Sequence, residues 1–362
     1  MTTTTVRLFS YRLPFLRPAT FLSPPLTHRE GYIIEVIGSD GHISQGESAP
    51  LPGYSIESLA TAGSQLQRIA KWIKRFEIDM AAPLESARQL CEDDCPSSVL
   101  FAVESAFAML AASSRSVPVA GIFNEDFSLD VPVNALIESA DDVRSRLSQL
   151  SSHNCRAAKL KVGRQSVESD IELVNVVREG LAPNIALRLD ANRRWTFEEA
   201  AQFASGVAGC DIEYIEEPTG DRRELPRLFT EFSNLPIALD ESVRDLSIDD
   251  IREGDYFSAV VIKPTVIGGI ARSFEIVRAC RQSGKKAVLG AAIESSVGLS
   301  MIAQMASSLI DETPIGLDTS RLFARDLTEP PLQVIDYTVN IEPDVTLPFR
   351  LNHDLLTEVP LV

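Results

Sequence analysis

The stretch IEYIEEPTGD, residues 212–221, indicates a short apolar strand that ends in two adjacent carboxylates, Glu216 and Glu217. Pro218 follows them and cannot donate a hydrogen bond to a sheet, so it helps to end the strand. A soluble surface does not require two adjacent acids here, because scattered acids serve equally well. The purpose of the pair therefore depends on how the neighbouring segments end.

Short β-rich runs alternate with amphipathic helical runs around this stretch, from Val131 onward. This alternation predicts strand–helix units that build a parallel sheet. Helix signals fill the intervals, for example a capping box at residues 196–199. The expected strands are VPVNALI (131–137), RAAKLK (156–161), IALRLD (185–190), DIEYIE (211–216), LPIALD (235–240), FSAVVIK (257–263), KAVLGA (286–291) and TPIGLD (313–318).

Eight strand–helix units are the number expected of a (β/α)8-type barrel. A doubly wound sheet is the alternative, but no glycine-rich phosphate-binding loop follows the first strand. We therefore expect an α/β fold with the barrel over residues 126–320. Residues 321–362 are too many for one final helix and are expected to return to the N-terminal domain.

Residues 1–125 have a different pattern and predict an α+β domain in front of the barrel. Residues 29–48 alternate in polarity around a Ser-Asp-Gly turn, as in a β-hairpin. Helical periodicity follows over residues 58–76 and 97–114.

The overall composition excludes several classes of protein. The net charge of −17 argues against nucleic acid or an anionic membrane surface as a partner. No run of eighteen apolar residues occurs, and the first residues lack the apolar core of a signal peptide. We expect a cytoplasmic protein with reduced cysteines, whose oligomeric state the sequence does not indicate. The cysteines have no spacing typical of a metal site: Cys91, Cys95, Cys155, Cys210 and Cys280.

Charged residues recur at the carboxyl ends of five successive expected strands. Each interval between them is about one strand–helix unit, so the side chains should meet at the same level of the barrel, on its catalytic face. One acid at a strand end commonly just begins a helix, but five in phase indicate a site. The five residues are Lys161, Asp190, Glu216, Asp240 and Lys263.

Strand parity adds two more cations to this site. Lys159 shares a face with Lys161, and Arg188 shares one with Asp190. Three buried cations require counter-charges, which the three carboxylates supply. Carboxylates without histidine or cysteine suit a hard divalent cation such as Mg²⁺, with Mn²⁺ as a substitute. None of the histidines ends an expected strand: His28, His42, His153 and His353.

Lysines beside a carboxylate metal site suit one kind of chemistry. A neutral lysine can abstract a proton, and a neighbouring cation lowers its pKa toward the working range. The metal then neutralises the enediolate that forms when a carbon next to a carboxylate loses its proton. The pattern predicts proton abstraction α to a carboxylate.

Five motifs in this order resemble the muconate-lactonising subgroup of the enolase superfamily, whose sites use a lysine base with Mg²⁺. They are KLK, LDAN, IEEP, LDES and IKP. The resemblance implies a barrel with an N-terminal capping domain. It also implies Asp190, Glu216 and Asp240 as metal ligands, with Glu217 supporting the site.

Further stretches are similar to the o-succinylbenzoate synthase family of menaquinone biosynthesis. They are GESAPLPGYS (46–55), LRLDANRRW (187–195), VVIKPT (260–265), IESSVGL (293–299) and GLDT (316–319). The resemblance implies a lyase that dehydrates 2-succinyl-6-hydroxy-2,4-cyclohexadiene-1-carboxylate to 2-succinylbenzoate. It implies Lys161 as the base, Lys159 as the residue that tunes it, and Lys263 as the cation that stabilises the enediolate.

The residues expected to bind substrate or support the site are Arg188, Asn192, Glu217, Gly290, Ala291 and Ser295. Gly290, Ala291 and Ala292 replace a serine run found in some family members, so only backbone N–H groups remain there to contact the succinyl group. Arg188 could instead form a salt bridge in the barrel floor, and Asn192 could cap a helix.

Other functions remain open at this point. An N-acylamino acid racemase or dipeptide epimerase would use the same lysine pair, and a muconate cycloisomerase is a weaker alternative. An inactive metal-bound binding barrel is the alternative from another class. Sugar-acid dehydratases of the superfamily are disfavoured, because their usual histidine base has no counterpart near the seventh strand.

Overall fold

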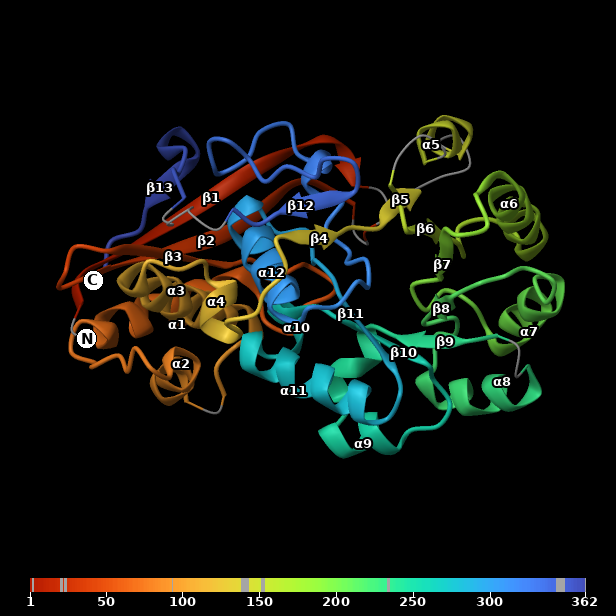
Figure 1. Ribbon diagram of the computed structural model, residues 1–362, viewed down its shortest axis with the longest axis horizontal. Coiled ribbons are helices and arrows are strands. Elements are labelled where there is room, and N and C mark those ends of the chain that lie inside the picture. Colours follow the sequence, from red (N-terminus) through yellow and green to blue (C-terminus); the bar gives the residue numbers. More distant parts are fainter. Residues whose placement is uncertain are drawn as a thin grey trace.

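The computed structural model describes residues 1, 3–19, 22, 25–92, 94–137, 143–150, 154–232, 235–342 and 349–361. His153 lies outside them. Figure 1 shows an antiparallel sheet with its helices on one side of the molecule and the curved parallel sheet with its helices on the other.

The N-terminal domain is built on a four-stranded sheet in the order β13-β1-β2-β3. The predicted hairpin is confirmed, since β2 and β3 pair from Tyr32–Ser48 to Ile37–Ile43. The sequence pattern does not predict strand β1, because Pro14 and Pro18 interrupt its alternation of apolar and polar residues. The elements are β1 Thr3–Ala19, β2 Leu26–Gly38, β3 Ile43–Ser48, α1 Leu59–Ile73, α2 Pro83–Cys91, α3 Ser97–Arg115, α4 Ala120–Phe123 and β13 Leu356–Glu358.

Helix α3 is the central helix of this domain. It is the one helix of the described residues that is long and apolar enough to cross a membrane. However, 83% of its most apolar window is buried inside the protein. Its closest neighbours are β3, α2 and α10, so packing within the molecule accounts for its composition.

The barrel contains a parallel sheet of seven strands in the order β11-β10-β9-β8-β7-β6-β5. Ile315 forms a parallel bridge to Val133, and Gly316 forms one to Gly290. These two bridges join the edges of the sheet, so the eighth expected strand closes the barrel. The seven strands are β5 Ala135–Ile137, β6 Ala157–Lys161, β7 Ala186–Asp190, β8 Tyr214–Glu216, β9 Ile237–Leu239, β10 Ala259–Ile262 and β11 Lys286–Leu289. The short strand β4, Asp130–Pro132, precedes β5 and lies outside this sheet.

The barrel class is confirmed, but the eighth strand–helix unit differs from the prediction. Directly after Asp318 the chain forms the short 3₁₀ turn η4, Ser320–Leu322, and Phe323 then bridges to Phe15 of β1. The chain leaves the barrel here to contact the N-terminal sheet, and none of the described residues after Asp318 form an α-helix. The helices of the other units are α5 Val143–Leu150, α6 Val167–Gly180, α7 Phe197–Gly206, α8 Leu225–Glu231, α9 Ile248–Glu253, α10 Pro264–Ile267, α11 Gly269–Gln282 and α12 Ser296–Ser308.

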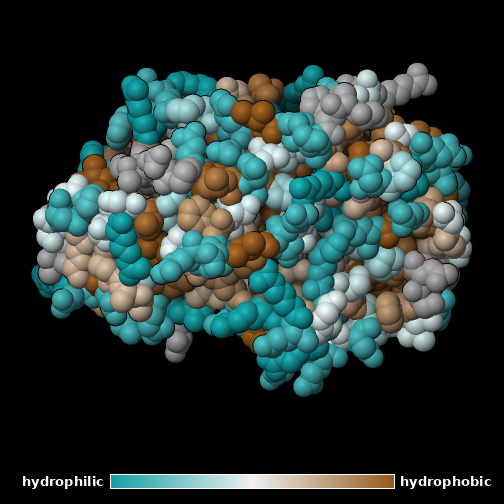
Figure 2. Space-filling model, viewed as in Figure 1, coloured by the Kyte–Doolittle hydropathy of each residue, from teal (hydrophilic) through white to brown (hydrophobic). Residues whose placement is uncertain are grey.

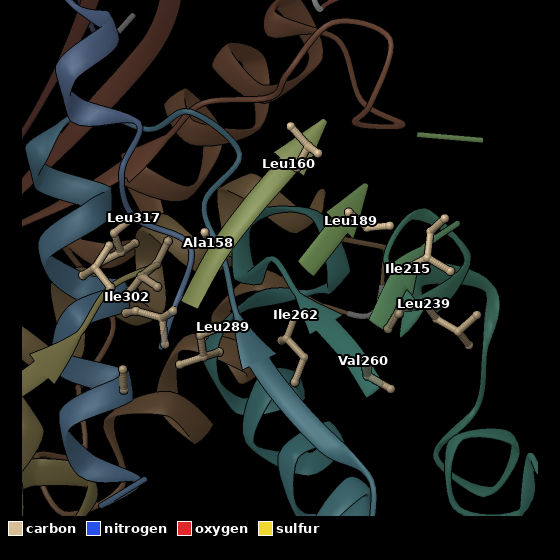
Figure 3. Packing of buried hydrophobic residues seen from close by; sticks show 14 of the residues in the cluster. Ala158, Leu160, Leu189, Ile215, Leu239, Val260, Ile262, Leu289, Ile302 and Leu317 are labelled. Atoms are coloured by element: carbon tan, nitrogen blue, oxygen red, sulfur yellow. The ribbon is translucent and has the colours of Figure 1, made fainter. Parts of the chain in front are cut away.

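Alternation along the barrel strands separates the apolar core from the charged residues. Figure 3 shows outward-facing residues such as Leu160, Leu189 and Ile262, which belong to the buried cluster beneath the helices. The intervening positions face the barrel interior. A small apolar group fills its lower part: Tyr214, Ala238, Ala259, Val261 and Val288. The charged strand ends lie above this group.

The C-terminal segment contacts both parts of the molecule. Strand β12, Thr338–Asn340, pairs with β4 of the barrel, and β13 pairs with β1. The short 3₁₀ turn η5, His353–Leu355, precedes β13 directly. The limits 1–125, 126–320 and 321–362 for the domains stay a prediction.

Candidate active site

A cavity of about 260 Å³ lies at the carboxyl ends of the barrel strands. Its walls include the barrel side chains Lys159, Lys161, Glu216 and Lys263, and the loop 51–54 of the N-terminal domain. The N-terminal domain therefore supplies one wall of the cavity, and the barrel supplies the charged groups.

Figure 2 shows one outer face of the molecule, where hydrophilic residues predominate and apolar ones are scattered.

Three buried carboxylates converge at the strand ends. Lys161, Asp190 and Glu216 are direct neighbours in register across β6, β7 and β8. The hydrogen-bonded row continues to Ala238, and Asp240 lies two residues further along the chain. Barrel strands are tilted and their register is staggered, so residues that meet at one level are offset in register. One oxygen from each of the three carboxylates still lies within 4.8 Å of the others.

Lys159 and Lys161 face the same carboxylates from β6. The Lys159 Nζ lies 2.8 Å from Asp190 Oδ2 and 2.6 Å from Glu216 Oε2. The Lys161 Nζ lies 2.5 Å from Asp190 Oδ2 and donates to Asn192 Oδ1 at 2.8 Å. Parity thus places both lysines inside the barrel, as predicted.

Lys263 approaches the cavity from the opposite side. It follows β10, and four strand positions separate β10 from β6 in a barrel closed by eight strands. Its Nζ donates to Asp240 Oδ2 and to the Tyr54 hydroxyl, each at 2.6 Å. Two lysines, Lys161 and Lys263, therefore stand across the cavity from one another.

The electrostatic environment separates the three lysines. Burial lowers the pKa of Lys161, and the nearby Lys159 and Lys263 lower it further against the opposing charge of Asp190. Burial also acts to lower the pKa of Lys159, but Asp190 and Glu216 outweigh it and hold that pKa well above its ordinary value. Burial acts most strongly to lower the pKa of Lys263, but the combined attraction of Asp240, Glu241 and Asp190 outweighs it and raises that pKa. Lys161 is thus the lysine most easily made neutral.

The carboxylate group fits a hard divalent cation. All three residues offer oxygen, the donor that Mg²⁺ and similar ions prefer. Burial raises the pKa of Glu216 to about 8, with Asp190 and Asp240 adding to the effect against Lys159. Bringing three carboxylates this close favours a bound cation in place of the proton.

Two known families match the chain. Residues 3–108 match the family described as "MenC, N-terminal domain", and residues 140–345 match "Enolase C-terminal domain-like". The o-succinylbenzoate synthase of Aliivibrio salmonicida is 33% identical over 332 residues, which cover 90% of this chain and 93% of that protein. The one from Pectobacterium atrosepticum is 35% identical, with 87% and 90% covered. The chain belongs to the o-succinylbenzoate synthase family.

Solved structures agree with this membership at the level of the fold. Muconate lactonizing enzyme from Pseudomonas fluorescens has a TM-score of 0.85 at 20% identity and covers 98% of this chain, with 97% of its own chain aligned. N-succinyl Arg/Lys racemase from Bacillus cereus has a TM-score of 0.86 at 19% identity, with 99% and 100% covered. This member of the o-succinylbenzoate synthase family thus shares its architecture with enzymes of other activities.

Glu217 lies outside the cavity and holds the loop that carries Asp240. Its Oε1 accepts the backbone N–H groups of Asp240 and Ser242 at 3.0 and 2.8 Å, and its Oε2 accepts the Ser242 hydroxyl at 2.9 Å. The second acid of the opening stretch therefore ties β8 to the neighbouring strand end. Its φ of 41° lies in the left-handed region, which these contacts stabilise.

Asn192 faces the cavity and does not cap the following helix. Its Oδ1 accepts a hydrogen bond from the Lys161 ammonium. Its backbone N–H donates to Asp190 Oδ1 at 3.0 Å, and its side-chain amide N–H donates to Glu241 Oε1 at 3.3 Å. Thr196 is the residue that caps α7, with the predicted capping box. The N-cap alternative for Asn192 is therefore wrong.

Arg188 lies one layer below the carboxylates and is fully buried. Its Nε donates to Glu213 Oε2 at 2.5 Å, and its Nη1 donates to the Pro314 carbonyl at 2.6 Å and to Asn134 Oδ1 at 3.3 Å. Asn134, unlike Arg188, lines the cavity. Arg188 thus forms the barrel-floor ion pair considered above and reaches the cavity only through Asn134.

The remaining expected residues divide between cavity and domain interface. Gly290 and Ala291 line the cavity. Ser295 is the N-cap residue of α12 and donates its hydroxyl to Glu47 Oε2 of the N-terminal domain at 2.7 Å. Ser295 therefore joins the two domains and does not face the cavity.

Sequence reasoning did not single out several polar residues of the cavity wall, among them Asn134, Glu241, Tyr54 and Asp318. Asn134 is a polar residue within an apolar strand, and Glu241 directly follows the expected ligand Asp240, so these two signals could have identified them. Tyr54 and Asp318 occur inside the motifs APLPGYS and GLDT.

Proposed function

We propose that the chain dehydrates 2-succinyl-6-hydroxy-2,4-cyclohexadiene-1-carboxylate to 2-succinylbenzoate, as an Mg²⁺-dependent lyase of menaquinone biosynthesis. The observation that carries this proposal is the pair Lys161 and Lys263 on opposite sides of the cavity, beside three converging carboxylates of which Glu216 lines the cavity. Membership of the o-succinylbenzoate synthase family supports the substrate.

Asp190, Glu216 and Asp240 would hold the cation, because they are the buried oxygen donors that converge. When bound, the cation offsets the negative charge that develops on the substrate carboxylate as the adjacent carbon loses its proton. Mn²⁺ has the same preference for oxygen ligands and should replace Mg²⁺.

Lys161 removes the proton from C1 of the substrate. Its lowered pKa increases the fraction of neutral amine that can act as the base. The electrons of the C1–H bond form the C1–C6 double bond of the aromatic ring, and the C6–O bond breaks. The ammonium of Lys161 returns its proton to the departing hydroxyl, which leaves as water.

Lys263 stays protonated and faces the negative charge from the other side of the ring. Its raised pKa keeps the ammonium charged through the reaction. Lys159, which contacts Asp190 and Glu216, lowers the pKa of Lys161 through its own positive charge. Gly290, Ala291 and Asn134 line the cavity, where their polar backbone and amide groups could face the succinyl chain.

The proposal extends to the cellular setting. All five cysteines are free, which suits the reducing cytoplasm. The net charge of −17 argues against nucleic acid or an anionic membrane as a partner, so we propose a small carboxylate as the molecule bound.

The direct test is incubation of the purified protein with the cyclohexadiene substrate and Mg²⁺ while the absorbance of the aromatic product is followed. Formation of 2-succinylbenzoate at an enzymatic rate supports the proposal. The opposed lysines also suit racemisation, since inversion of a carbon needs a base on each side. Rapid racemisation of N-succinylamino acids without dehydration would assign that activity in place of the lyase.

A further inference from the structure

Arg29 of β2 is a buried arginine that hydrogen-bonds two loops from different domains. Only 1% of its surface is exposed. In the N-terminal domain its Nη1 donates to the Pro50 carbonyl at 2.8 Å, and its Nη2 donates to the Ala49 carbonyl. In the barrel its Nε donates to the Ile293 carbonyl at 3.0 Å, and its Nη2 to the Ala292 carbonyl at 3.4 Å.

A fifth contact completes the set, since Nη1 also donates to the Glu30 carbonyl at 3.1 Å. A guanidinium has five N–H donors in a rigid planar fork, and Arg29 therefore uses all of them on backbone oxygens. No carboxylate of the described residues forms an ion pair with it within 4.0 Å. A buried charge without an ion pair is costly, which favours a specific role over general packing.

Both contacted loops continue directly into the cavity wall. Ala49 and Pro50 precede residues 51–54, which line the cavity from the N-terminal domain. Ala292 and Ile293 line it from the barrel, together with Gly290 and Ala291. One side chain outside the cavity thus connects two of its walls.

The barrel loop is strained at the point that Arg29 contacts. Ile293 has a φ of 61°, a left-handed conformation that a β-branched residue adopts only under constraint. The Arg29 Nε holds its carbonyl, and the buried Glu294 accepts the Ala292 N–H at 2.7 Å. The contact from the N-terminal domain therefore helps to maintain the strained backbone.

We propose that Arg29 is a positioning residue that fixes the N-terminal loop and the barrel loop relative to one another across the substrate cavity. Arg29 affects the reaction indirectly, because the loop whose carbonyls it binds continues to Tyr54. Tyr54 in turn contacts Lys263. The kinetic part of this inference rests on the proposed function, and the loop-ordering part does not.

The test compares wild type with Arg29→Lys and Arg29→Met, and uses Arg12→Met as the control. A lysine keeps the charge but offers three donors from one point, so it cannot span both loops. Arg12 lies on the neighbouring strand β1 with an exposed side chain. Hydrogen exchange measured by mass spectrometry should show faster exchange in residues 46–55 and 289–296 of both Arg29 variants, with the strands of the sheet unchanged.

For the dehydration reaction, kcat/KM of the Arg29 variants should fall by about 10- to 100-fold, with KM raised, as for a misplaced cavity wall. Arg12→Met should match wild type in both measurements. If Arg29→Met does not fold, the comparison of Arg29→Lys with wild type tests the proposal by itself. Unchanged exchange in either loop, or exchange raised equally throughout the N-terminal sheet, would overturn the proposal. Loop-specific exchange in a protein without dehydratase activity would reject the proposed function and retain the role of Arg29 in ordering the loops.

Discussion

The ammonium group of Lys263, at the end of β10, donates a hydrogen bond of 2.6 Å to the hydroxyl of Tyr54 in the N-terminal domain. The same nitrogen lies 4.2 Å from the centre of the tyrosine ring. Two residues 209 positions apart in the chain thus meet across the cavity. The N-terminal domain therefore contacts directly a lysine that we propose to take part in the reaction.

Replacing Tyr54 by phenylalanine should lower kcat/KM by about 10- to 100-fold, the loss expected for a hydrogen bond to a charged group. The ring remains, so the cation–ring contact and the packing are retained. Steady-state kinetics on the dehydration reaction measure the effect, with Tyr256→Phe as the control outside the cavity. Equal kinetics in wild type and Tyr54→Phe would contradict a role for this contact.

Shortening the loop 50–54, or replacing Gly53 to stiffen it, should raise KM and lower kcat together. Gly53 has a φ of 78°, which residues with a side chain adopt only with strain. A loop that closes over a substrate affects both binding and the chemical step. Kinetics unchanged in both parameters would show that the loop is only a connection between β3 and α1.

Replacing a proposed metal ligand should abolish turnover and leave the fold intact. Asp190→Asn, Glu216→Gln and Asp240→Asn each remove a ligand charge without changing core volume. Chelation by EDTA should likewise remove activity, and Mg²⁺ or Mn²⁺ should restore it. Circular dichroism checks the fold, and the exposed Asp211→Asn is the control. Full activity after exhaustive chelation would refute the metal-dependent mechanism.

The free energy of unfolding should depend on pH through the buried Glu104 of α3, whose carboxylate hydrogen-bonds the start of α11. Its Oε2 accepts the Ile270 N–H, whereas Oε1 has no hydrogen-bond partner. Burial raises its pKa to about 8 against the opposing charge of Arg88, from an ordinary value of 4.5. The folded state therefore keeps a proton that the unfolded state loses, and the free energy of unfolding falls as pH rises between these values.

Urea unfolding of wild type and Glu104→Gln from pH 5 to pH 8 tests this expectation. Glutamine cannot lose the proton, so the free energy of unfolding of the variant should fall less with pH than that of wild type. Glu85→Gln, an exposed change on α2, should behave as wild type. Parallel curves for wild type and Glu104→Gln would show that Glu104 does not titrate in this window.

Local sequence patterns could predict the strands and their charged ends, because parity and spacing decide which side chains enter a barrel. Lys159 and Asp190 are inside it for this reason. The two-residue offset of Asp240 from the hydrogen-bonded row of Glu216 depends on the stagger between strands, which spacing along the chain does not specify. Contacts between domains, such as that of Arg29 with Ile293, depend on docking and have no periodic signal.

Strand β1 shows a second limit of pattern analysis. Its prolines argue against a strand within a sheet, because proline cannot donate to a neighbour. The described pairing with β13 covers only Phe9, Ser10 and Tyr11. Beyond it the chain that leaves the barrel covers this edge, where the Ala324 N–H donates to the Pro14 carbonyl at 3.0 Å. Pro14 thus acts there only as an acceptor, and only tertiary structure shows which segment covers the edge.

The two opposed lysines should have unequal roles if the enzyme is a dedicated dehydratase. Lys161→Ala should remove turnover, because elimination from one face uses this residue first as base and then as acid. Lys263→Ala should lower kcat by about 10²- to 10³-fold, as for loss of a group that stabilises developing charge. The exposed Lys74→Ala should retain the wild-type rate.

Deuterium exchange with both enantiomers of an N-succinylamino acid separates this mechanism from racemisation. In a racemase each lysine serves one enantiomer, so Lys161→Ala would still exchange the enantiomer that faces Lys263, and Lys263→Ala the other. We expect dehydration by the wild type to be much faster than exchange at either face, since the raised pKa of Lys263 keeps it a poor base. Efficient exchange of both enantiomers, without dehydration of the cyclohexadiene, would show that Lys263 works as a base and that the chain is a racemase.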